Sequence, residues 1–305
     1  MKIFLSGGNG MVGRNIRSLA QSFGHILDAP SRLDLDLNDA QALENHLIQT
    51  APDIVIHAAG LVGGIQANIA APYDFCFQNL KMGMNLVQAA YNAGISKFLN
   101  IGSSCMYPRD AQNPLRESAL LTGELEPTNE GYAIAKIAVS RLAQYLSQQY
   151  GVAYKTIIPS NLYGMWDKFD IKNSHMIPSV IRKIHDAKVQ GLKCVEIWGD
   201  GTARREFLFA EDLGDFIFFA LDRFELLPGQ MNVGVGSDYT INEYYSIIKD
   251  VLAYDGDFKH DFTKPTGTKQ KLVDVSIQKG LGWFPKTDLR TGIARTYQFF
   301  LTGDK

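Results

Sequence analysis

The sequence predicts a doubly wound, Rossmann-type α/β fold, in which helices cover both faces of a parallel sheet. A smaller α/β lobe follows toward the C-terminus. In the first half, short apolar runs alternate with helix-length amphipathic segments. The run DIVIH at 53–57 is rich in β-branched residues, as in a strand buried on both faces. Pro and Gly punctuation around 159–165 then indicates a change of architecture.

Each element follows from its local pattern. An apolar run at 2–6 leads into a glycine-rich turn, and Ile134, Ile137, Leu142 and Leu146 have helical spacing. We expect strands at 2–6, 53–57, 97–103, 152–159, 195–198 and 231–235. We expect helices at 11–23, 75–93, 133–150, 177–186, 212–221, 242–252 and 289–301. This order predicts a dinucleotide-binding domain at 1–163 with return segments at about 207–236, and a substrate-binding lobe at 164–206 and 237–305.

Composition narrows the class of protein. Of 305 residues, 46% are hydrophobic and 20% charged, and the net charge of −2 offers no basic excess for nucleic acid or a membrane surface. The sequence shows no signal peptide and no apolar stretch near the ~20 residues that span a bilayer. Three sparse cysteines predict a reducing cytoplasm without disulfides, and no Cys or His spacing predicts a metal site.

Gly7, Gly10 and Gly13 lie between the first strand and the first helix. Glycine permits a tight turn and close approach of a pyrophosphate, and the start of the following helix attracts the anion. The same three glycines also occur in ordinary strand-to-helix turns, but their place at the start of the chain favours a Rossmann-type dinucleotide site.

The choice between NAD and NADP depends on the end of the second strand. Asp28 there would favour a free ribose 2′-OH, whereas Ser31 and Arg32 would favour a 2′-phosphate. The alternative is that these are surface residues. We favour NADP(H).

Tyr132 and Lys136 are four residues apart at the start of a predicted helix and share one face. A nearby ammonium stabilises a phenolate, which would lower the pKa of the phenol toward neutrality. Ser103, at a strand end, could hydrogen-bond a substrate carbonyl beside the phenol. Solvated helix faces also carry such pairs, but the order after a dinucleotide loop favours a reductase.

These features resemble the extended short-chain dehydrogenase/reductase family. The likeness spans most of the chain and is carried by the segments GGNGMVG, HAAGLVGG, GSSCMYP, EPTNEGYAIAK, PSNLYG, NSHMIP and WGDGTARREF. Within the family the chain looks like the enzymes that convert GDP-4-keto-6-deoxy-D-mannose to GDP-L-fucose with NADPH. The resemblance implies epimerisation at C3 and C5, reduction at C4 and a homodimer formed through the helices around 79–93 and 136–150.

The resemblance also implies residue roles. Cys105 would be the base and His175 the acid of epimerisation, a thiolate and an imidazolium acting on acidic C–H bonds next to a ketone. From the residues alone, an isolated Cys is usually a small buried hydrophobe, and a lone His is more often a hydrogen-bonded structural residue. The implied cofactor contacts also include Met11, Val12, Ala58, Ala59, Gly60, Lys136, Pro159, Asn161, Leu162 and His175. The implied substrate contacts are Ser104, Asn161, Lys183, Trp198, Arg205 and Lys271.

Alternatives remain open. Asn9 stands where an Arg often helps to hold the 2′-phosphate, which weakens the preference for NADP. The stretch after Ser103 lacks the Asp-Glu pair of 4,6-dehydratases, and a UDP-hexose 4-epimerase would not need Cys105 and His175. The nearest rival is a reductase or epimerase-reductase of another GDP-4-ketosugar, such as a heptose or a 3,6-dideoxy sugar. A redox-sensing binding protein is a rival from another class, but such proteins tend to lose the Tyr or Lys.

Overall fold

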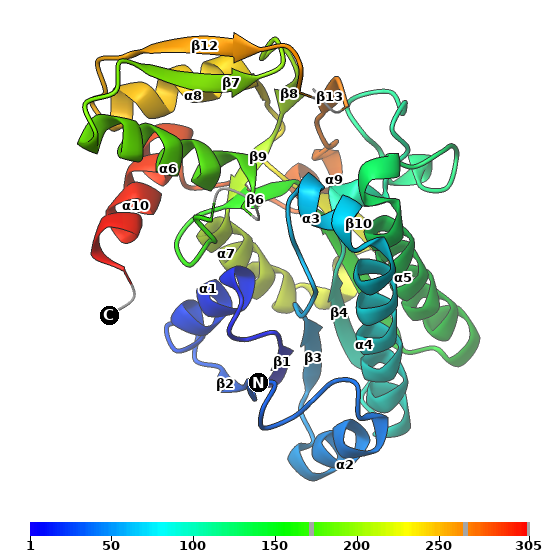
Figure 1. Cartoon of the computed structure of the whole chain (residues 1–305). Helices are drawn as coiled ribbons and strands as arrows, with labels where there is room; N and C mark the ends of the chain where they lie inside the picture. Colours follow the sequence, from blue (N-terminus) through cyan, green and yellow to red (C-terminus); the bar gives the residue numbers. More distant parts are fainter. Residues whose placement is uncertain (171–173, 265–267, 304–305) are drawn as a thin grey trace.

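A parallel sheet forms the centre of the structure, a computed structural model that describes residues 1–170, 174–264 and 268–303 (Figure 1). Its strand order is β10-β5-β4-β3-β1-β2, and every neighbouring pair is parallel. The order reverses direction between β1 and β3, which is the switch point at which doubly wound folds bind ligands. The strands are β1 (Lys2–Ser6), β2 (Ile26–Asp28), β3 (Ile54–His57), β4 (Lys97–Ile101), β5 (Ala153–Pro159) and β10 (Gln230–Val233).

Helices bury both faces of this sheet. Successive strand residues point to opposite faces, so Ile54 and Ile56 join one core cluster while Val55 joins the other. α1 and α7 supply Ile16 and Phe216 to the first cluster. α2, α4 and α5 pack on the second. The bounds of these helices are α1 (Met11–Ala20), α2 (Ala40–Thr50), α4 (Pro72–Asn92), α5 (Glu130–Tyr150) and α7 (Ala210–Leu221).

A second body is built mainly from later segments. Its core gathers Ile181, Ile197, Tyr245, Phe258 and Ile293 from different elements. Figure 1 shows the helices of this body beyond the carboxyl ends of the main strands. Its elements are α6 (Met176–Val189), β7 (Cys194–Trp198), α8 (Ile241–Val251), β12 (Asp257–Asp261) and α10 (Leu289–Thr302).

Short strands join the two bodies. β6 (Asn161–Tyr163) pairs with β9 (Phe207–Phe209), and β8 (Arg204–Arg205) lies between β11 (Tyr239–Thr240) and β13 (Gln270–Lys271). These pairs bring segments that are far apart in sequence to the carboxyl edge of the main sheet.

The predicted fold class is confirmed, and most predicted elements lie within a few residues of their expected bounds. The sequence patterns missed the helices α2, α3 (Ile65–Ala70) and α9 (Ser276–Gly280), and the strands β6, β8, β9, β11, β12 and β13. Strands of two or three residues are too short to show a period. The domain boundary needs one correction, because Leu281 and Trp283 pack in the first core rather than in the second body. Among the described residues, no helix has the length and apolarity that crossing a membrane requires.

His57 closes the carboxyl end of β3 in a fully buried position. Its Nδ1 lies 2.8 Å from the Oγ of Ser6 at the end of β1, and that hydroxyl also accepts the N–H of Ala59 at 3.3 Å. Burial, and then the charge of Lys136, lower the pKa of His57 to about 3. The imidazole is therefore neutral in the folded protein at neutral pH.

This burial predicts a specific acid sensitivity. Between pH 6.5 and about 3 the unfolded chain binds a proton at His57 that the folded chain does not, so stability falls as pH falls through this window. Between pH 6.5 and roughly 5 the loss is about 2 kcal/mol. Denaturant unfolding at the two pH values measures this loss of free energy of unfolding. In His57→Gln the loss is expected to be smaller than in the unmodified chain by about 2 kcal/mol. Equal losses would contradict the assignment.

Candidate active site

The glycine loop after β1 is shaped by close backbone contacts. Gly7 has a φ of +75°, and a Cβ on it would lie 2.6 Å from the Cα of Ala59. A Cβ on Gly13 would lie 2.1 Å from the carbonyl oxygen of Gly7. Only glycine fits these two positions. The N-terminus of α1, which has neither a side-chain cap nor an acidic residue in its first turn, begins at Met11.

This cradle fits a dinucleotide pyrophosphate. Three of the four loop residues 7–10 are glycine, and the first N–H groups of α1, including those of Met11 and Val12, have no side-chain cap. The chain continues from β3 past the glycine loop through Ala58, Ala59 and Gly60. A Cβ on Gly60 would lie 3.7 Å from the ammonium of Lys136. The cofactor loop and the predicted catalytic lysine are therefore parts of one site.

The residues at the end of β2 differ in availability. The carboxylate of Asp28 is paired with His46 at 2.7 Å. Ser31 donates to Asp34 at 2.6 Å. The side chain of Arg32 is 80% exposed, with only a 4.0 Å ion pair to Asp36 among the described residues. The exposed guanidinium of Arg32 and the occupied carboxylate of Asp28 favour a 2′-phosphate over a free 2′-OH. Asn9 accepts from Arg17 at 2.9 Å, which adds a second cation beside the loop.

Tyr132 and Lys136 lie on the first turns of α5, next to the end of β4. Lys136 is only 7% exposed, and its ammonium donates to the carbonyl of Ile101 at 2.9 Å. It lies 5.9 Å from the ring centroid of Tyr132. The Ser103 hydroxyl lies near enough to the Tyr132 phenol to lower its pKa. The structure thus brings Ser103, Tyr132 and Lys136 together as the spacing predicted.

The sequence predicted a lowered pKa for the Tyr132 phenol, and this prediction is wrong in direction. Burial raises the pKa of Tyr132 above its ordinary value, the charge of Cys105 raises it further, and the nearby Ser103 hydroxyl offsets only part of this rise. Burial also lowers the pKa of Lys136 to about 8. Desolvation outweighs the ammonium here, so Tyr132 is suited to give a proton rather than to rest as a phenolate.

Cys105 lies in the short 3₁₀ turn Ser104–Met106 directly after Ser103. The Ser103 hydroxyl accepts the N–H of Cys105 at 3.2 Å, which fixes the turn. The sulfur receives a hydrogen bond from the Asn129 amide at 3.3 Å and lies 3.8 Å from the Lys271 ammonium. The turn therefore aims the thiol into the site, whereas Ser104 is 2% exposed.

His175 occupies the N-cap position of α6, and the preceding Asn173 of the NSHMIP segment lies outside the described residues. Burial, and then the charge of Lys168, lower the pKa of His175. The expected imidazolium is therefore the minor form in the ligand-free chain. Among the described residues no contact joins His175 to Cys105. A base and an acid acting on opposite faces of a sugar ring would need that separation.

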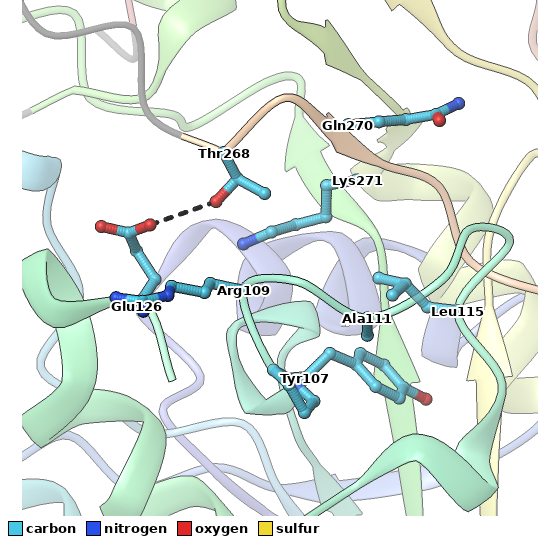
Figure 2. A pocket seen from close by; sticks show the side chains of 9 residues that line it. Tyr107, Arg109, Ala111, Leu115, Glu126, Thr268, Gln270 and Lys271 are labelled. Atoms are coloured by element: carbon cyan, nitrogen blue, oxygen red, sulfur yellow. Dashed lines mark hydrogen bonds between the residues drawn. The ribbon is translucent and has the colours of Figure 1, made fainter. Parts of the chain in front are cut away.

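Arg205 and Lys271 come from paired short strands. The register of β13 with β8 places Lys271 directly opposite Arg205. Burial lowers the pKa of Arg205, while the charges of Cys105 and Glu126 act in the opposite direction. Figure 2 shows Lys271 extending from β13 into the pocket that Glu126 and Arg109 line, with Thr268 hydrogen-bonded to Glu126 at 3.3 Å.

Lys183 and Trp198 form a separate part of the second body. The Lys183 ammonium lies 4.9 Å from the ring centroid of Trp198, a cation–π contact. Burial lowers the pKa of Lys183, partly offset by Glu196. Asn161, on β6 beyond Pro159, donates to the carbonyl of Glu206 at 3.0 Å, and the adjacent Leu162 packs against the first core. The ligand contacts predicted for these residues stay predictions.

Sequence reasoning missed two polar residues of the site. Asn129 contacts the Cys105 sulfur, and Glu206 accepts three backbone N–H groups, from Val235, Gly236 and Val273. The Glu206 bonds hold β8 and β9 against the neighbouring loops. An Asn before a helix indicates a cap rather than a contact with sulfur, so the sequence gives no signal for Asn129. Among the described residues, no group of three or more His, Cys, Asp or Glu could hold a metal ion.

The parallel sheet, the glycine loop and the Ser–Tyr–Lys cluster define a dinucleotide-dependent class of enzyme. Residues 3–234 match the NAD dependent epimerase/dehydratase family. The chain belongs to this family, which confirms the resemblance that the motifs indicated.

Relatives of known name match nearly the whole chain. A GDP-L-colitose synthase from Yersinia pseudotuberculosis is 50% identical over 302 residues, covering 99% of this chain and 98% of the relative. A GDP-L-fucose synthase from Azorhizobium caulinodans is 45% identical over 304 residues, covering 100% of this chain and 97% of the relative.

Solved structures are similar over the same length. A GDP-6-OMe-4-keto-L-xylo-heptose reductase from Campylobacter jejuni has a TM-score of 0.92 at 30% identity, covering 99% of this chain and 97% of that one. A GDP-mannoheptose C4 reductase from Campylobacter jejuni with NADP bound has a TM-score of 0.89 at 30% identity, covering 98% of each chain.

The glycine cradle makes a direct prediction. Gly13→Ala places a Cβ against the Gly7 carbonyl, so it is expected to destabilise the fold by roughly 1–3 kcal/mol and to weaken NADPH binding at least tenfold. Gly229→Ala is the matched control, because nothing lies within 4 Å of its Cβ position. NADPH fluorescence titration and thermal unfolding measure both effects. Unchanged binding and melting temperature for Gly13→Ala would contradict the cradle.

Proposed function

We propose that the protein inverts C3 and C5 of GDP-4-keto-6-deoxy-D-mannose and reduces C4 with NADPH, yielding GDP-L-fucose. One observation carries the proposal: a thiol held by an amide and an ammonium lies in the same site as a Ser–Tyr–Lys cluster. The first arrangement suits proton transfer at carbon and the second suits carbonyl reduction. A GDP-L-fucose synthase at 45% identity over the full chain supports the same reaction.

NADPH supplies a hydride to C4 when it is bound. Ser103 orients the C4 carbonyl by hydrogen bonding, and Tyr132 gives its proton to the oxygen as the C4–O group gains charge. Lys136 stabilises the phenolate that remains. Arg32 and Ser31 hold the 2′-phosphate, and the uncapped start of α1 holds the pyrophosphate.

Epimerisation uses the ketone before it is reduced. Cys105 removes a proton α to the carbonyl, and the electron pair enters an enolate whose oxygen Ser103 and Tyr132 stabilise. His175 gives a proton to the opposite face of the same carbon. Because burial lowers the pKa of His175, this step requires a ring that is protonated in the substrate complex. Arg205, Lys271 and Lys183 bind the diphosphate side of the substrate, and Trp198 packs near the nucleotide.

Solvent isotope exchange tests the epimerase step. Incubated with the ketosugar in D₂O without NADPH, the protein is expected to place deuterium at C3 and C5. Cys105→Ser is expected to slow this exchange by about 10²-fold or more, because general-base catalysis contributes about 10²–10⁴. Reduction of the already epimerised ketosugar by Cys105→Ser continues. Reduction at C4 by the unmodified protein with no deuterium at either carbon would refute the proposal.

A second candidate is favoured by the 50% identity to a GDP-L-colitose synthase. A 3-deoxy ring has no stereocentre at C3, so an enzyme for that sugar inverts only C5 before reducing C4. Comparing kcat/KM for the 6-deoxy and 3,6-dideoxy ketosugars, and for a GDP-4-ketoheptose, identifies the substrate. A tenfold preference for the 6-deoxy sugar supports the primary proposal.

The proposed active form is a homodimer in the cytoplasm. α4 and α5 pack side by side, and a Cβ on Gly83 would lie 2.4 Å from Val139 (Figure 1). Their outer surface exposes large apolar side chains, which a second copy would cover. These are Tyr73, Phe77, Met84, Ile134 and Tyr145. The free thiols of Cys76, Cys105 and Cys194 agree with a reducing compartment.

Light scattering tests the dimer. The protein is expected to have twice the 33.9 kDa mass of one chain, and Phe77→Glu with Met84→Glu is expected to halve it, because two charges would be buried in the interface. Leu226→Glu, on an apolar residue exposed elsewhere, is the control and should leave the mass unchanged. A monomeric mass for the unmodified protein would contradict the dimer.

A further inference from the structure

We propose that Asn129 is a positioning residue for the Cys105 base, donating an amide hydrogen bond that holds the thiolate toward the sugar ring. The inference rests on the proposed function, because only the epimerisation needs a base at Cys105. Asn129 would act through the sulfur and need not touch the substrate.

Asn129 occupies a helix-capping position without capping the helix. α5 begins at Glu130, and Asn at the preceding position ordinarily accepts a backbone N–H of the first turn. Here the side chain makes no such bond. Its Nδ2 instead donates to the Sγ of Cys105 at 3.3 Å, a contact across 24 residues of sequence. The Asn129 side chain therefore bonds the sulfur and not the backbone of α5.

The other end of the amide has no hydrogen bond. The Oδ1 of Asn129 is buried and has no partner among the described residues. Buried polar atoms are rarely left unpaired, and one that is indicates strain or a functional constraint. Both features, the absent cap and the unpaired oxygen, follow if the amide N–H is reserved for a sulfur that carries negative charge.

Other groups around the sulfur supply charge but not direction. The Lys271 ammonium, from β13, is farther away at 3.8 Å, and the charge of Arg205, from β8, interacts with Cys105. Tyr132 faces Cys105 from α5, and Glu126 opposes the cations. Lys271 and Arg205 are also predicted to serve the diphosphate. Asn129 is neutral and, unlike Tyr132, has no part in the proposed reduction, so it can direct the thiolate without competing for the substrate's phosphates.

The chemistry balances within the site. When the thiolate removes the proton from C3 or C5, the C–H bond breaks, an S–H bond forms and the electron pair passes into the enolate. A sulfur held by Asn129 approaches that carbon from one direction, whereas an unrestrained thiolate could turn toward Lys271 and away from the ring.

Asn129→Asp is the sharpest test. It keeps the shape of the side chain, and Asp is as well suited as Asn to the position before a helix. It replaces the donor with a negative charge facing the sulfur. In D₂O it is expected to slow deuterium entry at C3 and C5 by about 10²-fold. Reduction of the already epimerised ketosugar should stay within about threefold of the unmodified rate, since Ser103, Tyr132 and Lys136 are unchanged.

Thiol alkylation provides a readout that does not depend on turnover. In a Cys76→Ser, Cys194→Ser background, the pH midpoint of iodoacetamide reaction at Cys105 is expected to rise by about one unit or more in Asn129→Asp. Asn129→Ser, which keeps a short donor, should fall between the two proteins in both assays. Asn92→Asp, at the far end of α4, is the matched control and should leave both unchanged.

The outcomes separate the two claims. Equal slowing of exchange and reduction, or an unmoved alkylation midpoint in Asn129→Asp, overturns the positioning role. If the unmodified protein exchanges no deuterium, the proposed function fails, and the positioning role fails with it even where the alkylation midpoint moves. A moved midpoint together with a loss confined to exchange supports both.

Discussion

A single buried cation determines the character of the site. Lys136 is 7% exposed, and among the described residues its ammonium bonds the carbonyl of Ile101 and no carboxylate. Burying a charge without a counter-charge is costly, and burial lowers the pKa of Lys136 accordingly, to about 8. The same charge helps to keep His57 neutral. A site that retains such a cation favours the two anions that the proposed reaction forms, the phenolate and the enolate.

The sheet explains how this cation meets the other groups. Parallel strands end at one edge, so β1, β3, β4 and β5 deliver the glycine loop, Ala58–Gly60, Ser103 and Asn161 to the same place. The short pairs β6–β9 and β8–β13 then add Arg205 and Lys271 from the later half of the chain. The two solved GDP-heptose reductases share this frame over nearly their whole length.

The sequence predicted those parts that depend on local pattern. DIVIH predicted a two-faced buried strand, and the order of the glycine loop, Ser103 and Tyr132–Lys136 predicted the reductase cluster. It could not predict what depends on contacts across the chain. From the sequence, Asp28 is a candidate for contact with a ribose. In the structure, helix α2, which the sequence patterns missed, places His46 against its carboxylate. A sequence does not show the desolvation that shifts the pKa values of Tyr132 and His175. It also does not show the contact of Asn129 with the sulfur of Cys105, 24 residues away.

The central claim is that Lys136 is a buried cation whose pKa lies well below that of a free lysine. A ¹⁵N NMR titration of the lysine side chains, with the Lys136 signal assigned by its absence in Lys136→Met, measures this directly. We expect a midpoint near 8 for Lys136 in protein without cofactor or substrate. A midpoint at or above the ordinary 10.5 would show that the ammonium is solvated or paired, and would contradict the account.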